Sequence, residues 1–391
     1  MTTSQIRSLV LVVLMPMCSY AFGQKLQSLP LPELQTFASV FNQLNNTLVP
    51  SVERSALLVH AIRGMVRGAD PEGGEYFTEE EYLESKEGLP AGIGDVGVTV
   101  LFRGGQPVLV PADGGPARKS GVFAGDVLLS IDGTAVDDLS QAQVLRRLRG
   151  PAGTKANLLL FRPGLSAQVV LAVERAELRS PDLAVVRLQS DLLLLRVPEF
   201  SANTLQMAVD ATRKEWSKGL VKGLILDLRS NQGGVLEQAV GLAAMFLPEG
   251  AVIAEMSSGA PLAKRTVLAA NSSYSKPLAP DPLAGLPAAL KILPLAVLVD
   301  DGTVAGAELT AMALRDNKRA VIVGRTTYGR SSIQTITPLR GMGATKMTTG
   351  FWSSPSGQRL SRKGITPDLV VPDFSSEVVL EAAIGALRGR R

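Results

Sequence analysis

The sequence of 391 residues contains only one histidine, His60, and one cysteine, Cys18. Zinc, haem and iron–sulfur sites need several nitrogen or sulfur ligands, so this scarcity excludes most of them. A Ser-His-Asp or Cys-His mechanism would have to use His60, which lies in a predicted helix and is expected to be an ordinary surface or packing residue. We therefore predict no metal site and no cofactor.

The sequence also lacks a strong excess of charge of either sign. Forty Lys and Arg residues stand against thirty-six Asp and Glu, a net charge of +4, and there is no basic stripe that would indicate nucleic-acid binding. With 46% apolar and 19% charged residues, the chain can form a substantial core and is not disordered. Its length predicts two or three domains.

The N-terminal residues have the pattern of a secretory signal. Arg7 precedes an apolar run over residues 9–15, and Ala21 and Gly23 supply the small residues of a cleavage site. The run is too short to span a bilayer comfortably. We predict a signal peptide over residues 1–23, cleaved near Gly23, and an exported, periplasmic protein.

Cys18 lies inside this predicted signal peptide. A lipidated cysteine is an alternative, but Met17 is bulky where a lipoprotein signal prefers a small residue. After cleavage the chain would have no cysteine, and hence no disulfide, although it enters an oxidising compartment. The remaining sequence has no apolar run long enough for a membrane helix, so we expect no integral membrane segment after cleavage.

Residues 24–87 are predicted to be a helical segment. Apolar residues at steps of three and four indicate a first helix that ends before Pro50. A second helix over residues 57–65 is closed by Gly68 and the Asp70-Pro71 pair.

Residues 88–175 change to short strands separated by glycine turns. Strands are expected at residues 96–102, 108–111, 127–131, 158–161 and 169–173. Ser140 can cap a helix that carries Val144 and Leu148. This order resembles a PDZ domain, a partly open β-barrel with two helices that binds an extended peptide at a sheet edge.

Gly92, Gly94 and Gly97 match the dinucleotide fingerprint G-x-G-x-x-G, but a strand-forming Val-Thr-Val-Leu-Phe follows where a helix is required. We interpret this loop as one whose backbone N–H groups converge on the terminal carboxylate of a peptide. An apolar pocket for the last side chain is expected beside it. The predicted peptide-binding residues are Gly92, Ile93, Gly94, Val144 and Leu148.

Residues 176–373 alternate strands and helices, which is typical of an α/β layer fold. A buried strand at 223–229 leads through a tight turn into a helix, and residues 257–290 are expected to be irregular. Another strand at 295–299 leads into a helix that carries Leu309 and Met312. A C-terminal helix is expected within residues 374–391.

Four segments follow the PDZ-like region, and their motifs in this order are specific to one family. They read GLILDLRSNQGG, VLVDDGTVAGAEL, RAVIVGRTTYGRSSIQT and SPSGQRLSRKGITPDLVVP. From about residue 34 to 373 the chain resembles the carboxyl-terminal processing peptidases, also called tail-specific proteases. The resemblance implies an α/β serine-peptidase-like core that cuts near a C-terminal tail held by the PDZ domain. It also implies dimer elements in the N-terminal helices and the last helix, so we expect a homo- or hetero-oligomer.

Transferred position by position, the resemblance places the nucleophile at Ala305, the general base at Arg330 and the assisting amide at Gln334. Alanine has no oxygen to attack a carbonyl, and arginine stays protonated, so it cannot take a proton as a desolvated lysine does. Loss of two linked groups indicates decay of an enzyme into a binding protein. The resemblance also implies an oxyanion turn. Its residues are Gly233, Gly234 and Gly306.

Two main readings remain open from the sequence, and a third, a peptide-binding scaffold unrelated to proteolysis, differs from the first only in its partner. The first is an inactive homologue that binds protein C-terminal tails and acts as adaptor, regulator or partner of an active protease. The second is an active serine-type endopeptidase with a displaced nucleophile, for which Thr303, Ser331 and Ser332 are the nearby hydroxyls. Lys318 follows the helix after Ala305 and is expected at the distant surface.

Overall fold

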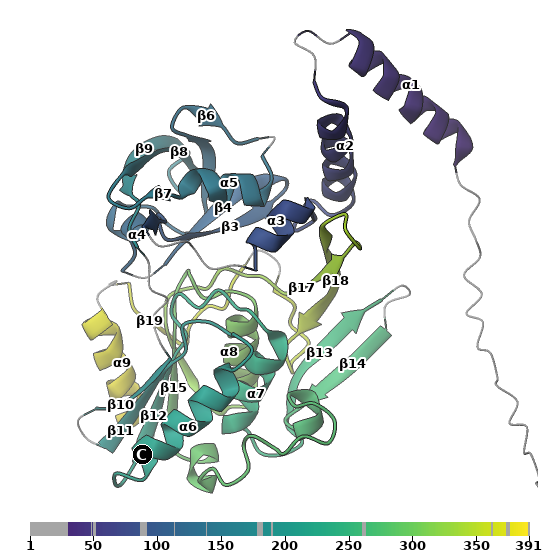
Figure 1. Ribbon diagram of the computed structural model, residues 1–391. Helices are drawn as coiled ribbons and strands as arrows, with labels where there is room; N and C mark the ends of the chain where they lie inside the picture. The colour runs from purple at the N-terminus through teal and green to yellow at the C-terminus, as the bar shows by residue number, and fades with distance from the viewer. Residues whose placement is uncertain are drawn as a thin grey trace, which may run out of the picture. The chain divides into compact units, whose positions relative to one another are not determined.

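The computed structural model describes residues 30–47, 49, 52–86, 92–112, 114–137, 139–177, 183–188, 191–259, 263–360, 363–372 and 376–389. The predicted signal peptide and Cys18 lie outside the described residues. The chain divides into two units, Met1–Leu58 and Val59–Arg391, which are described separately (Figure 1).

The first unit contains the helix α1 (Leu31–Thr47) and the start of α2 (Arg54–Ala69), and both predicted helices are confirmed. None of the residues of α1 is buried, and the rings of Phe37 and Phe41 stack with their centroids 6.5 Å apart. The predicted role of these helices in an oligomer stays a prediction.

The second unit begins within α2, where His60 is exposed. Two short elements, β1 (Glu75–Phe77) and α3 (Glu79–Glu84), follow. Side chains of α2 and α3 form a buried polar network. In it, the Arg63 guanidinium donates two hydrogen bonds of 2.6 and 2.7 Å to the Glu81 carboxylate. Thr78 caps α3 through a capping box with the same glutamate.

The PDZ-like region forms one sheet with the strand order β3-β4-β5-β8-β9 and its own apolar core. The sheet's strands are β3 (Val98–Arg103), β4 (Gln106–Pro111), β5 (Asp126–Ile131), β6 (Thr134–Ala135), which pairs with β5, β8 (Lys155–Arg162) and β9 (Ala167–Glu174). A separate pair joins β2 (Ile93–Gly94) to β7 (Gly150–Pro151). The helices are α4 (Pro116–Lys119) and α5 (Gln141–Leu148). The five predicted strands and the Ser140 cap are confirmed.

The α/β core is built on a six-stranded sheet of order β10-β11-β12-β15-β16-β19, parallel except for the pair β10–β11. Its strands are β10 (Ala184–Leu188), β11 (Leu192–Arg196), β12 (Gly223–Asp227), β15 (Leu295–Val299), β16 (Val321–Gly324) and β19 (Leu369–Val370). Successive side chains of these strands point to opposite faces of the sheet, and each face belongs to its own apolar cluster. One face packs on α6 (Thr204–Trp216), α7 (Leu236–Phe246) and α8 (Gly306–Asp316), and the other on α9 (Ser376–Arg388). Burial on both faces explains why these strands read as continuous apolar runs.

A second sheet has the order β1-β18-β13-β14, with β17 paired to β18. Besides β1, its strands are β13 (Val252–Ser258), β14 (Ala263–Leu268), β17 (Ser332–Pro338) and β18 (Ala344–Ser353). Part of the segment expected to be irregular, residues 257–290, is therefore regular, and that expectation was wrong there. Strand β14 is mostly exposed, with the sequence AKRTVL, so it shows none of the long apolar pattern that identifies a buried strand.

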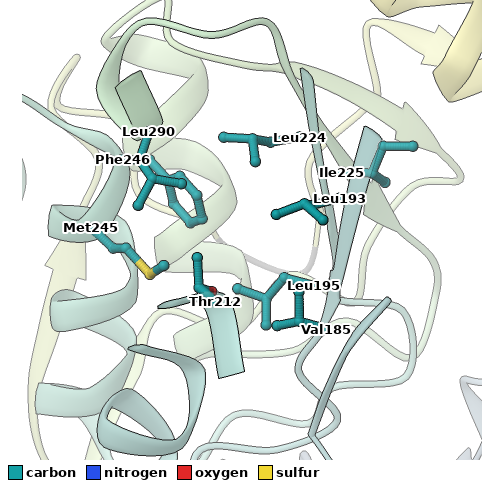
Figure 2. A pocket seen from close by; sticks show the side chains of 9 residues that line it. All are labelled: Val185, Leu193, Leu195, Thr212, Leu224, Ile225, Met245, Phe246 and Leu290. Carbon is teal, nitrogen blue, oxygen red and sulfur yellow. The ribbon is translucent and has the colours of Figure 1, made fainter. Parts of the chain in front are cut away.

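The core also encloses a small cavity of about 10 Å³ between the sheet and the helices α6 and α7 (Figure 2). Eight of its nine lining residues are apolar, and Thr212 is the exception. The volume barely accommodates one water molecule, and no charged group lines it, so we interpret it as a packing gap. No helix within the described residues is long and apolar enough to cross a membrane.

Candidate active site and peptide-binding groove

Three loops meet at the carboxyl edge of the parallel sheet. They follow β12 (residues 228–235), β15 (residues 300–305) and β16 (residues 325–331). In open α/β sheets this edge is where ligands bind, because the carboxyl ends of parallel strands lie together there. The residues that the resemblance assigned to catalysis and to the oxyanion turn lie on these loops or next to them.

The partly buried carboxylate of Asp300 ties the first two loops together. It accepts hydrogen bonds from Ser230 N at 2.8 Å and from Gly302 N at 3.0 Å, while the Ser230 hydroxyl lies 3.1 Å from its other oxygen. Burial raises the pKa of Asp300, and the neighbouring Asp301 raises it further. The predicted oxyanion turn and the loop of Ala305 are therefore fixed to each other by one side chain.

Ala305 precedes α8 with φ 50° and ψ −108°, a conformation that non-glycine residues rarely adopt. A Cβ added at Gly233 would lie 3.1 Å from the Ala305 Cβ and 3.2 Å from Gly306 N. The structure therefore brings Gly233, Ala305 and Gly306 together. A strained backbone at the start of a helix is typical of positions that present a nucleophile.

The three glycines of the predicted oxyanion turn differ in what their backbone can offer. The Gly233 amide already donates to Asn231 Oδ1 at 2.9 Å. A Cβ at Gly234 would lie 2.2 Å from Phe200 O, so only glycine fits there. Gly306 is the first residue of α8, where helix amides lack partners inside the helix. Of the three amides, the one of Gly233 already has an acceptor within the turn.

Glu308 joins the loops of Ala305 and Arg330. Its fully buried carboxylate accepts hydrogen bonds from Ala305 N (2.9 Å), Gly329 N (2.6 Å) and Arg330 N (2.8 Å), and from the Thr327 hydroxyl. Burial raises the pKa of Glu308 to about 7, and the four donors oppose that shift. This role was not predicted from the sequence, although an acidic residue three positions after a helix cap is the spacing of a capping box.

Arg330 points toward the turn between α2 and β1. A Cβ at Gly73 would lie 3.4 Å from the Arg330 guanidinium, and the Arg330 Nε donates to the Ser332 hydroxyl at 3.2 Å. Burial lowers the pKa of Arg330, while Tyr328, Asp70 and Glu72 act in the opposite direction. Arginine nevertheless keeps its proton in proteins. Arg330 is therefore a cation that neighbouring acidic and polar groups hold in place.

Gln334 packs on the same turn. A Cβ at Gly73 would lie 1.5 Å from Gln334 Nε2, so a larger residue at position 73 would displace the amide. Gln334 Nε2 is buried and has no hydrogen-bond partner within the described residues. The turn over residues 70–74 thus contributes to the candidate site, which no sequence motif had indicated.

Two of the three alternative hydroxyls are buried and already hydrogen-bonded. Thr303 Oγ1 donates to Leu228 O at 2.9 Å, and Ser331 Oγ donates to Leu360 O at 2.6 Å. Ser332 is partly buried and accepts from Arg330. Lys318 is exposed and lies beyond the far end of α8, which spans about 15 Å from Gly306 to Asp316 at 1.5 Å per residue, in agreement with the expectation.

The predicted peptide-binding residues lie at the start of the PDZ sheet and on α5. Ile93 is half-buried, and Val144 and Leu148 are fully buried in the PDZ core. Gly94 lies so close to Arg175 that an added Cβ would meet its carbonyl carbon at 2.6 Å. The pocket for a terminal side chain stays a prediction.

The PDZ region contacts the loops of the candidate site directly. Gln232 Nε2 donates to Val110 O at 3.3 Å, and the Arg118 guanidinium lies 3.0 Å from the Asp301 carboxylate. A cavity of about 40 Å³ lies where β3 meets the loop after β16. It is lined by Glu72, Leu101, Phe102, Arg103, Tyr328, Gly329, Arg330 and Ser332.

Comparisons with known proteins agree with this architecture. The family model of the PDZ domain matches residues 108–162, and that of peptidase family S41 matches residues 191–371. The fold and the loops define a serine-type peptidase core joined to a PDZ domain. The chain belongs to peptidase family S41, among the carboxy-terminal processing proteases.

Individual relatives cover most of the chain. The carboxy-terminal-processing protease of Bartonella bacilliformis is 29% identical over 343 residues, which are 87% of this chain and 75% of that protein. The chloroplastic C-terminal processing peptidase of Tetradesmus obliquus is 30% identical over 81% of this chain and 68% of that protein. The solved photosystem II D1 C-terminal processing protease is 26% identical with a TM-score of 0.67, over 84% of this chain and 86% of that one.

The pKa of Glu308 predicts how stability depends on pH. The folded chain holds a proton on this carboxyl up to about pH 7, whereas the unfolded chain releases it near the ordinary value of 4.5. The free energy of unfolding should therefore decrease as the pH rises from 5 to 7.5, by about 2 kcal/mol from this group. Glu308→Gln should remove that part of the slope in urea unfolding curves. The exposed Glu237→Gln serves as control, and parallel pH profiles for Glu308→Gln and wild type would contradict the assignment.

Proposed function

We propose that this chain is an exported, catalytically inactive member of the carboxy-terminal processing proteases. In this proposal it binds the C-terminal tails of proteins through its PDZ domain and serves as adaptor, regulator or partner of an active relative. Its compartment is the periplasm, reached through the signal peptide expected over residues 1–23.

One observation carries the proposal. Ala305 and Arg330 stand on two loops that are joined through the buried Glu308 carboxylate, at the positions where the family is expected to hold its nucleophile and its base. A methyl group cannot form an acyl-enzyme, and a guanidinium cannot act as general base near neutral pH. The same scaffold keeps the strained backbone at Ala305. These features support a site that has lost its reacting groups and kept its architecture.

The surroundings of the nearby hydroxyls favour inactivity over a displaced nucleophile. Thr303 and Ser331 donate to main-chain oxygens and are 0% and 3% exposed, so neither is presented to a substrate. Ser332 accepts from a guanidinium, which is not a base. Removing any one member of a catalytic unit costs most of its activity, so two losses leave little to recover.

The first prediction from this proposal is that the purified protein has no peptidase activity. It should neither cleave an unfolded substrate with an apolar C-terminal tail nor react with a fluorophosphonate probe, because no serine is activated by a base. Mass spectrometry of the probe-treated protein is the measurement, with an active member of the family as positive control. Labelling at Thr303, Ser331 or Ser332, with turnover lost when that residue is changed to alanine, would establish the displaced nucleophile instead.

The second prediction is that the protein recognises the free carboxylate of a C-terminal tail. A charge-assisted hydrogen bond contributes roughly 1.5–3 kcal/mol, so a peptide ending in a small apolar residue should bind about ten- to a hundredfold more tightly than its amidated copy. Isothermal titration of the two peptides measures the difference. Equal affinities would mean that the PDZ domain does not recognise C-termini and serves assembly alone.

A further inference from the structure

The peptide-binding edge of the PDZ sheet is not free in this structure. A tail that adds to a PDZ domain pairs with the terminal strand of the sheet that lies next to a helix, which here are β3 and α5. Backbone groups along β3 would have to accept and donate the new hydrogen bonds. The partners of these β3 backbone groups therefore decide when a tail can enter. This inference rests on the proposed tail binding.

Gln141, the first residue of α5, spans the groove to β3. Its Nε2 donates to the carbonyl oxygen of Val100 at 2.7 Å. The amide oxygen of the same side chain accepts a hydrogen bond from the Lys346 ammonium. A tail strand alongside β3 would need the Val100 carbonyl as an acceptor, so the bound side chain and the tail compete for it.

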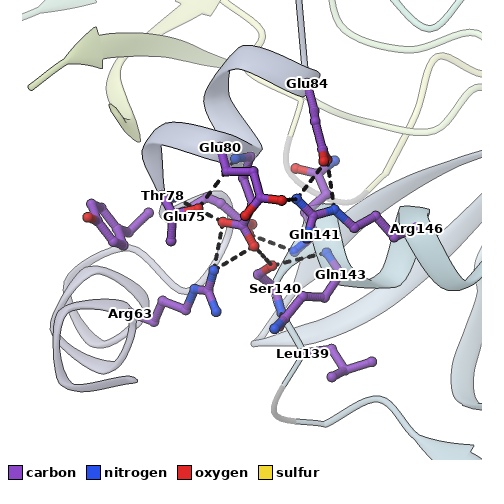
Figure 3. A network of polar contacts seen from close by, with 12 residues as sticks. Arg63, Glu75, Thr78, Glu80, Glu84, Leu139, Ser140, Gln141, Gln143 and Arg146 are labelled. Atoms are coloured by element: carbon purple, nitrogen blue, oxygen red, sulfur yellow. Dashed lines mark hydrogen bonds and ion pairs between the residues drawn. The ribbon is translucent and has the colours of Figure 1, made fainter. Parts of the chain in front are cut away.

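Lys346 comes from β18, which belongs to the second sheet and not to the PDZ domain. It lies directly opposite Glu75 of β1 in the antiparallel pair. The Glu75 carboxylate in turn accepts from Gln141 N at 2.6 Å (Figure 3). Together with the contact of Lys346, these two strands therefore hold the start of α5 by both its side chain and its main chain. Burial raises the pKa of Glu75 and lowers that of Lys346, which indicates that the pair is withdrawn from water.

Two further contacts close the same groove. Arg67 of α2 donates to Leu139 O, next to the cap of α5, and its guanidinium lies 5.5 Å from the ring centroid of Phe102 in β3. Arg67 thus links the segment before α5 to β3, in addition to the contact of Gln141 with Val100.

We propose that Val100, Gln141 and Lys346 form a latch that keeps the PDZ groove closed to C-terminal tails. In the latched state, the Lys346 ammonium fixes the Gln141 amide on the Val100 carbonyl. A tail binds after Gln141 leaves Val100, so capture of a tail releases α5 from β18. Binding of a tail and the contact between the PDZ domain and the second sheet are then mutually exclusive, and the free protein binds tails more weakly than its open form.

Two variants open the latch from opposite sides, and each has a matched control. Lys346→Met keeps the length of the side chain and removes the donor, while Gln141→Ala removes the bridge itself. The controls are Lys264→Met, on the exposed strand β14, and Gln168→Ala, on the exposed part of β9. In fluorescence anisotropy with a labelled free-acid peptide ending in alanine, both latch variants should bind about tenfold more tightly than wild type, the factor that one net hydrogen bond is worth. Both controls should match wild type.

Hydrogen exchange of the unliganded full chain tests the latch without any peptide. Opening should speed amide exchange in segments that cover residues 98–103 and 139–143 of both latch variants, with no change in either control. If no protein binds the peptide but exchange rises, the proposed tail binding fails and the latch stands. Unchanged exchange in both latch variants, or peptide affinities equal to or below that of wild type in folded variants, would overturn the latch whether or not tails bind.

Discussion

The candidate site depends on one buried carboxylate. Glu308 accepts main-chain hydrogen bonds from Ala305, Gly329 and Arg330, and thereby holds the loop after β15 against the loop after β16. None of these bonds involves the side chains at positions 305 and 330. The geometry is therefore independent of which residues stand there, and a change of side chain at those positions leaves the framework intact. This independence explains how the architecture of a peptidase persists with an alanine and an arginine at its centre.

The same principle applies to the neighbouring loop. Asp300 holds Ser230 and Gly302 by their backbones, and Asn231 orients the Gly233 amide. These groups form a continuous polar framework around an otherwise apolar sheet, because main-chain amides in tight turns need internal acceptors once they are buried. Function at this edge of the sheet can change by substitution of a few side chains that the framework does not use, while the framework itself is retained.

Much of the fold was predictable from the sequence, for identifiable reasons. The strands over 223–227 and 295–299 are buried on both faces and read as apolar runs, and the Ser140 cap marks the start of α5. The exposed strand β14 was missed because nothing in its sequence distinguishes it from a loop. Of the site, motif order located Ala305, Arg330 and Gln334. The turn over residues 70–74, the bonds of Glu308 to the loop after β16 and of Asp300 to Ser230, and the contact of Gln141 with Lys346 could not be predicted. They depend on how segments far apart in the chain meet, which local patterns do not encode.

The most direct test of the account is to return the two missing groups to the framework. The double variant Ala305→Ser, Arg330→Lys should regain weak cleavage of an unfolded tail-bearing substrate, because the held loops and the Gly306 amide remain. Each single variant should stay inactive, since a serine without a base and a lysine without a nucleophile have nothing to act through. Activity in the Ala305→Ser variant alone, or no activity in a correctly folded double variant, would contradict the claim that the site kept its architecture when it lost its chemistry.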